Sequence, residues 1–183
     1  ASLEGDVTPK VPASYLQEHP RAVVYVDPES GALLGPSRDP IGLELAKLEE
    51  FRYKAAQDHY YHLFIAADFT RIPESSLRAF ARKALEGGAV TMTAWGKGAS
   101  IMELILDHEA VSHFHRSKRE ENDENAILTG SHRPEDLEKA LFFYLDNLRP
   151  APVYELTCDT AVAVVAGTVP KRELLLDSLQ HPG

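Results

Sequence analysis

The sequence predicts an α/β fold, a three-layer sandwich with a mostly parallel sheet and a C-terminal antiparallel hairpin at one edge. Apolar runs typical of buried strands alternate four times with amphipathic helical segments, an order that joins parallel strands by right-handed crossovers. Two runs near the C-terminus are separated by residues 158–160, a link too short for a crossover helix, so they predict an antiparallel pair. The length of 183 residues suits one domain.

Six segments rich in β-branched and aromatic residues predict strands. In chain order they are residues 22–26, 60–67, 90–95, 126–129, 153–157 and 161–165. Residues 1–20 are rich in proline, serine and charge and show no hydrophobic period. We therefore expect an extended N-terminal arm over residues 1–20 and a single α/β domain over residues 21–183.

Five segments have the apolar spacing of amphipathic helices. In chain order they cover residues 40–55, 73–86, 99–111, 134–148 and 173–176. Asp39-Pro40 predicts the first helix start, and Gly87-Gly88 a left-handed end to the second helix. The third helix is expected to turn inward Ile101, Met102, Leu104, Ile105 and His108.

Composition restricts the possible partners. A net charge of −9 argues against binding to a nucleic-acid backbone and leaves cations, basic proteins and small molecules. The lone Cys158 precludes an internal disulfide and favours a reducing compartment, so we expect a cytoplasmic protein. No apolar run approaches the roughly 20 residues of a membrane span, and no signal-peptide pattern is visible at the N-terminus.

The turn Trp95–Ser100, WGKGAS, has the composition best suited to a ligand. Two glycines allow close approach of a ligand to the backbone, and the following helix offers free amides and a positive dipole end to an anion. The candidate ligand-binding residues here are Trp95, as a stacking face, Gly96, Lys97, Gly98 and Ser100. The turn matches neither the phosphate loop nor a complete G-x-G-x-x-G, because Ile101 replaces the third glycine. The alternative is that the glycines only form a tight strand-to-helix turn.

Polar residues at two other strand ends are further ligand-binding candidates, because ligands of open α/β sheets bind beyond the carboxyl ends of strands. Asp68 can bind a cation or a ribose hydroxyl, or cap its own turn. Thr129, Ser131 and His132 follow the fourth predicted strand, and His132 can act as an acid–base group near neutral pH. Alternatively, Ser131 caps a helix and His132 is a surface residue.

Two other groups invite chemical hypotheses. Asp107, His108 and Glu109 lie near two more histidines, but helical spacing predicts His108 in the core and both acids facing away, so we expect no metal site. Cys158 can be a nucleophile only if a histidine reaches it, and a buried structural thiol is the alternative. No cofactor and no catalytic residue can be assigned from the sequence.

Short motifs resemble a small bacterial α/β, Rossmann-like family of uncharacterised function. They are Ala66-Ala67-Asp68, Ala94-Trp95-Gly96, and Ser131-His132 leading into Leu137-x-x-Ala140-Leu141-Phe142-Phe143, within residues 60–150. The resemblance implies the same fold and functional strand ends, and it implies no activity. Gly98-Ala99-Ser100 has no counterpart in that pattern.

Three functions follow as hypotheses. The first is binding of a small anionic ligand, a nucleotide being one candidate, over the turn Trp95–Ser100. The second is an acidic protein-interaction module, such as an inhibitor or accessory subunit, that uses residues 118–125 and the N-terminal arm. The third is an enzyme that uses His132 with Asp68 or Cys158, and it ranks last because no nucleophile–base–orienter set is visible.

Overall fold

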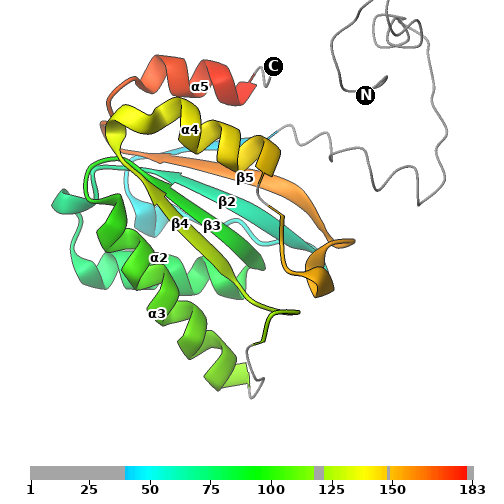
Figure 1. Cartoon of the computed structure of the whole chain (residues 1–183). Helices are drawn as coiled ribbons and strands as arrows, with labels where there is room; N and C mark the ends of the chain where they lie inside the picture. Colours follow the sequence, from blue (N-terminus) through cyan, green and yellow to red (C-terminus); the bar gives the residue numbers. More distant parts are fainter. Residues whose placement is uncertain (1–39, 118–121, 148, 181–183) are drawn as a thin grey trace, which may run out of the picture. The chain divides into compact units, whose positions relative to one another are not determined.

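The structure is a computed structural model that describes residues 40–117, 122–147 and 149–180 (Figure 1). Its strands are β1 (Ile41–Leu45), β2 (Tyr60–Ala66), β3 (Ala89–Trp95), β4 (Leu128–His132) and β5 (Cys158–Ala166). They form one sheet in the order β1-β5-β2-β3-β4, and every neighbouring pair is parallel. The strand expected at 22–26 and the arm at 1–20 lie outside the described residues.

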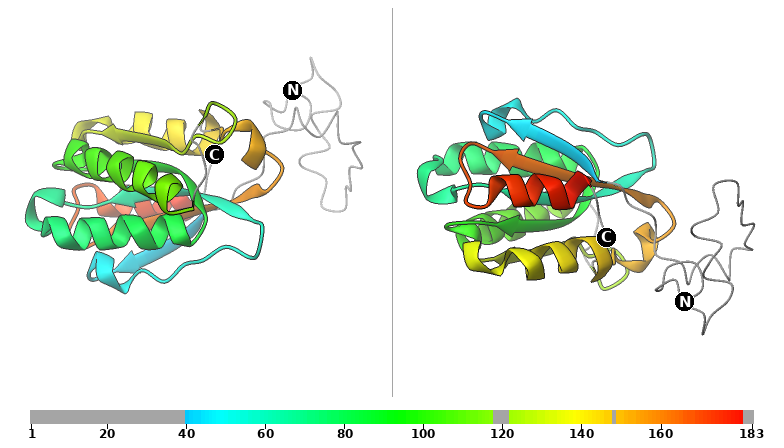
Figure 2. Two further views of the ribbon diagram at one scale, coloured as in Figure 1. Left: turned by 90° about the horizontal axis from the view of Figure 1, so that it is seen from below. Right: turned by 90° about the horizontal axis from the view of Figure 1, so that it is seen from above.

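Helices pack against both faces of the sheet. They are α2 (Glu74–Glu86), α3 (Ala99–Ser117), α4 (Leu137–Phe142) and α5 (Arg172–Gln180). Helices α2 and α3 cover one face, whereas α4 and α5 cover the other, as the two views of Figure 2 show. Successive strand residues point to opposite faces, so Leu63 and Met92 pack under α2 and α3, and Phe64 and Trp95 under α4 and α5. In the part of the chain that the structure describes, no helix has both the length and the apolar content to cross a membrane.

The C-terminal antiparallel hairpin is a wrong prediction. Residues 158–166 form the single strand β5, and Pro152–Tyr154 form a 3₁₀ turn where the first hairpin strand was expected. Strand β5 lies between β1 and β2 and is parallel to both. Residues 158–160, which were expected to be a short link between two hairpin strands, are therefore the first residues of the central strand β5.

The helix predicted over residues 40–55 is also wrong. Ile41–Leu45 form the edge strand β1, a short 3₁₀ turn follows at Leu48–Glu50, and the next residues run to β2 without helix. Apolar residues at 41, 43 and 45 fit a strand as well as 41, 45 and 48 fit a helix. Pairing with β5, which is distant in sequence, decides between the two.

Three predicted segments differ at their boundaries. Strand β4 covers Leu128–His132 rather than residues 126–129, which brings Ser131 and His132 into the sheet. Helix α3 runs to Ser117, and the fourth helix changes at Phe143 to a π-helical turn, η5 (Phe143–Asn147).

The order of the strands puts the topological switch point at the carboxyl ends of β2 and β5. From β2 the chain passes through α2 to β3 and through α3 to β4, always on one face. It then crosses the other face through α4 to reach β5 on the far side of β2. Because the connections from β2 and β5 leave toward opposite faces, the loops there diverge, which is the usual position of a ligand in such sheets.

Candidate functional site

The turn after β3 packs directly on the loop after β2. Gly96 has φ +129, and a Cβ at this position would lie 2.2 Å from the carbonyl oxygen of Ala67. Gly98 has φ +74, and its Cβ would lie 2.8 Å from Cγ2 of Thr70. The Phe69 amide also donates to the Lys97 carbonyl over 2.9 Å. Packing of the two turns therefore accounts for both glycines without a ligand.

Trp95 lies in the core. Its side chain is fully buried under α4 and α5, so the ring has no exposed face on which a ligand could stack. Among the described residues its indole Nε1 has no hydrogen-bond partner. Of the predicted site residues around the turn, those with accessible side chains are Lys97 and Ser100.

Lys97 and Ser100 are the exposed polar side chains where α3 begins. Neither side chain makes a hydrogen bond or an ion pair with any residue that the structure describes. The first turn of α3 carries no acid, whereas Glu74, Glu138 and Glu173 lie in the first turns of α2, α4 and α5. The first turn of α3 thus adds no counter-charge to the positive end of its dipole, while the Asp68 carboxylate lies close enough to Lys97 to interact with it electrostatically.

Asp68 closes its own loop. Its carboxylate accepts hydrogen bonds from the Thr70 hydroxyl at 2.5 Å and the Thr70 amide at 3.2 Å, and lies 3.3 Å from Nε of Arg71. The Thr70 hydroxyl is the main reason that the pKa of Asp68 falls below its ordinary value. This geometry makes Asp68 the cap of the short helix Phe69–Arg71.

Thr129 and Ser131 fasten the edge strand β4 to α3. The Thr129 hydroxyl donates to Asp107, and the Ser131 hydroxyl donates to Oε2 of Glu103 over 2.5 Å. Ser131 is therefore a strand residue bonded to α3, and it does not cap the following helix. These hydroxyls point away from the face on which His132 lies.

His132 is half-buried on the opposite face of the sheet, with its ring centroid 5.7 Å from that of Phe143. Burial lowers the pKa of this imidazole below its ordinary value and favours the neutral ring. No hydrogen bond or ion pair joins Asp68 to His132 among the described residues. Cys158 begins β5, at the amino edge of the sheet, so β5 and β4 hold Cys158 and His132 at opposite edges. The residues of the enzyme hypothesis are thus not brought together.

Basic residues missed in the sequence also follow the strands. They are Arg71 after β2, Arg133 after β4, and Lys171 and Arg172 after β5. Arg172 pairs with Glu44 and donates to the carbonyl of Gly167. Arg133, Lys171 and Lys97 have no ion-pair partner within the described ranges. The signal, a basic residue shortly after each of β2, β3, β4 and β5, was hidden because β5 was taken for half of a hairpin.

The predicted inner face of α3 is corrected by the structure. His108 is exposed, as are Ile101 and Leu104, whereas the Glu109 side chain is 1% exposed. Glu109 accepts hydrogen bonds from Arg82 at 2.8 Å and from Arg78 at 3.2 Å, and Arg82 in particular lowers the pKa of this carboxyl. The described residues contain no group of three or more metal-ligating side chains.

Comparisons with known proteins give one family and one local match. A sequence model of a family described as "Domain of unknown function (DUF7684)" matches residues 43–182. A protein named glucosamine-6-phosphate deaminase, from Ligilactobacillus salivarius (strain UCC118), is 59% identical over 34 residues. That stretch is 19% of this chain and 14% of the bacterial protein, so the match spans a small part of both. No solved structure matches.

Proposed function

The chain belongs to DUF7684, a domain family of unknown function, and we propose that it binds a small anionic ligand. Membership of this family assigns no activity, so the proposal rests on the geometry of the strand ends. The ligand lies at the carboxyl edge of the sheet, over the start of α3. A nucleotide or a sugar phosphate has the required charge and size. We also propose that the fold is a three-layer Rossmann-like sandwich, as the helices on both faces of the sheet suggest. We further propose that the family is bacterial and that the protein works in the cytoplasm, the latter because the chain has a single cysteine.

One observation carries the proposal. Lys97 and Ser100 are exposed and unpaired within the described residues, at the beginning of the long helix whose first turn contains no acid. Backbone amides, an ammonium group and a hydroxyl are the donors that hold phosphate groups at helix starts.

Charges on the neighbouring loops support the same ligand. Arg133 is exposed after β4, the neighbour of β3, and Lys171 is exposed after β5, which β2 separates from β3. The opposite edge carries both signs of charge, with Asp58, Glu155 and Asp159 as well as Lys54 and Lys83. In a chain of net charge −9, the cations at the carboxyl edge can raise the local concentration of an anion there.

Glycines and Asp68 have a supporting role in this proposal. Gly96 and Gly98 hold the turn against the β2 loop, which fixes the start of α3, and Asp68 fixes the loop on which the turn rests. His132 lies near the edge as a neutral imidazole that can donate or accept one hydrogen bond.

The test is a titration of the whole chain with inorganic phosphate, glucosamine 6-phosphate and ADP, followed by calorimetry and thermal unfolding. The second probe is the sugar phosphate in the name of the locally similar bacterial protein, glucosamine-6-phosphate deaminase. Lys97→Gln should weaken the tightest probe about tenfold or more, because a hydrogen bond to a charged group is lost. Lys54→Gln, the same change of charge at the opposite edge, should leave the affinity unchanged. Equal loss in both variants would show a net-charge effect only, and no binding by any probe would contradict the proposal.

A second candidate is a protein-interaction module, and the outer side of α3 favours it. Ile101, Leu104 and Val111 are 46%, 69% and 45% exposed and are spaced by three and seven residues. Acids flank this stripe on the β4 side, and Arg78, Arg82 and Arg116 flank it on the α2 side. If two copies pack α3 in parallel, the acidic flank of each faces the basic flank of the other, as in coiled coils.

Sedimentation equilibrium of the whole chain tests this candidate. Leu104→Glu should convert a dimer to a monomer, whereas Leu174→Glu, on the exposed side of α5, should not. A chain that is monomeric at high concentration would contradict self-association through α3.

A further inference from the structure

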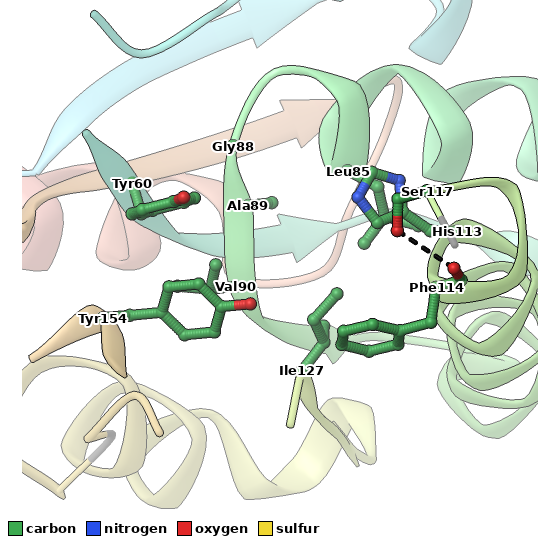
Figure 3. A pocket seen from close by; sticks show the side chains of 10 residues that line it. All are labelled: Tyr60, Leu85, Gly88, Ala89, Val90, His113, Phe114, Ser117, Ile127 and Tyr154. Atoms are coloured by element: carbon green, nitrogen blue, oxygen red, sulfur yellow. Dashed lines mark hydrogen bonds between the residues drawn. The ribbon is translucent and has the colours of Figure 1, made fainter. Parts of the chain in front are cut away.

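A pocket of about 300 Å³ lies at the amino ends of β2 and β3, at the edge of the sheet opposite the proposed anion site (Figure 3). Tyr60 and Tyr154 form one end of it, and Phe114 and Ser117 of α3 the other. Side chains from β3, from the end of α2 and from the segment before β4 complete the walls. Its volume is at the lower end of the range of small-molecule sites.

We propose that this pocket binds an uncharged, planar aromatic small molecule of the size of phenol, indole or a nucleobase. The proposal does not depend on the anion site, because the two sites lie at opposite edges of the sheet and share no residue. Three properties of the lining lead to it: its aromatic rings, its hydroxyl groups and its lack of acidic, lysine and arginine side chains.

Aromatic rings at both ends favour a flat ring between them. Tyr60 and Tyr154 meet edge to face, with centroids 4.6 Å apart and planes at 61°. Figure 3 shows these two rings at one end and the rings of His113 and Phe114 at the other, with Val90 and Ile127 between them. Edge-to-face and offset contacts with such rings stabilise an aromatic guest beyond the burial of its area.

Two side-chain hydroxyls of the lining, those of Ser117 and Tyr60, can orient the guest. The Ser117 hydroxyl donates to the Phe114 carbonyl over 3.0 Å, and its oxygen keeps capacity to accept. The Tyr60 hydroxyl makes no hydrogen bond within the part of the chain described here and can donate to the guest. A guest with one N–H or O–H group therefore finds an acceptor at one end and a donor at the other.

Charge selects against anions. The ten residues that line the pocket include no aspartate, glutamate, lysine or arginine. The surrounding loops of the amino edge carry Asp58, Glu86 and Asp159. A carboxylate or phosphate would lose hydration without a counter-charge in the pocket and would be repelled by these acids.

Methyl-resolved NMR of the whole chain tests the proposal. The probes are indole and phenol, and the matched anions are indole-3-acetate and benzoate. We expect saturable shifts at the methyl groups of Val90 and Ile127, with dissociation constants of about 0.1–1 mM for the neutral rings, and affinities at least about tenfold weaker for the anions.

Two matched variants locate the binding. Ser117→Trp adds an indole at the exposed end of α3, where it occupies the pocket mouth, and should abolish the shifts. His115→Trp adds the same side chain to the same helix at an exposed position outside the lining and should preserve them. Folding of both variants is checked by their methyl spectra.

The proposal is overturned by any of three results. They are the absence of saturable shifts up to about 10 mM probe, equal binding of the anions, and unchanged binding in Ser117→Trp. Failure here leaves the anion site untouched, because that site is tested with phosphates and Lys97→Gln.

Discussion

At the scale of single residues, two glycines with positive φ differ in what surrounds them. Gly96 is buried, and a Cβ there would overlap the Ala67 carbonyl. Gly167, at the end of β5, has φ +66, and nothing lies within 4 Å of the position of its Cβ. The first glycine therefore meets both a backbone and a packing requirement, and the second a backbone requirement alone.

The two glycines predict a matched pair of unfolding measurements. Gly96→Ala should lower the free energy of unfolding by about 3 kcal/mol or more, because the clash is with a backbone atom that cannot move aside cheaply. Gly167→Ala should cost only about 1 kcal/mol, the strain of a left-handed alanine. Urea denaturation measures both, and equal costs would contradict the packing of the two turns described above.

At the scale of elements, Glu109 joins α2 to α3. Its buried carboxylate is bonded to Arg78 and Arg82 of α2, while the arginines keep contact with solvent, their side chains being 32% and 52% exposed. The same carboxylate lies 3.8 Å from Arg116 on its own helix. One buried acid thus fixes the rotation of α3 about its axis, because only one face of the helix can present residue 109 to α2.

Replacement of this acid predicts a loss of stability. Glu109→Gln should lower the free energy of unfolding by about 2 kcal/mol, because charged hydrogen bonds at a buried position are lost while the arginines remain solvated. The control is Glu74→Gln, which removes a 66% exposed partner of Arg78 and should have little effect. Similar losses of unfolding free energy in both variants would show that burial of Glu109 does not make its hydrogen bonds more stabilising than the exposed ion pair of Glu74.

At the scale of the whole molecule, titration of half-buried and buried groups sets the pH dependence of stability. The pKa of His132 is lowered by burial, so the unfolded chain takes up this proton first as the pH falls below about 6.5. Its contribution to stability is fully present above that pH and is lost as the pH falls toward the folded-state pKa. Glu109, whose pKa is also lowered, adds a second loss below about 4.5.

The expected profile is a free energy of unfolding that declines in two steps on acidification. His132→Gln should remove the first step, whereas His115→Gln, at an exposed position on α3, should preserve it. Chemical denaturation between about pH 3 and pH 8 measures the profile. A first step that survives in His132→Gln would show that another group causes it.

Much of the architecture could be predicted from local pattern. Three elements, β2, β3 and α2, occur within one or two residues of their predicted ranges. Their local sequences fit one type of secondary structure only: continuous apolar runs for the strands, and an apolar helical stripe with a proline start and a glycine end for the helix. The edge strand β1 could not be predicted, since its five residues fit two periods. Likewise α3 has apolar residues on two sides, so its period alone could not choose between Leu104 and Glu109 as the buried residue.

The candidate site was predicted in part. Its position at the strand ends and the residues Lys97 and Ser100 follow from the sequence, and ligand binding there stays a prediction. The roles of the others depend on neighbours distant in sequence. Ser131 is bonded to Glu103, and Gly96 lies against Ala67. Lys171, after β5, lies at the same edge as the proposed site only because β5 is a parallel strand within the sheet.

By itself the sequence determined the α/β class, the β2–α2–β3–α3 series and the turn that begins α3, because hydrophobic period and turn residues act over a few neighbouring positions. Tertiary structure alone decided the position of β5, the rotation of α3 and the pocket at the amino edge. These features depend on which of several compatible surfaces come into contact. Burial and strand pairing across the whole sheet determine which surfaces meet, and neither can be predicted from a short stretch of the sequence.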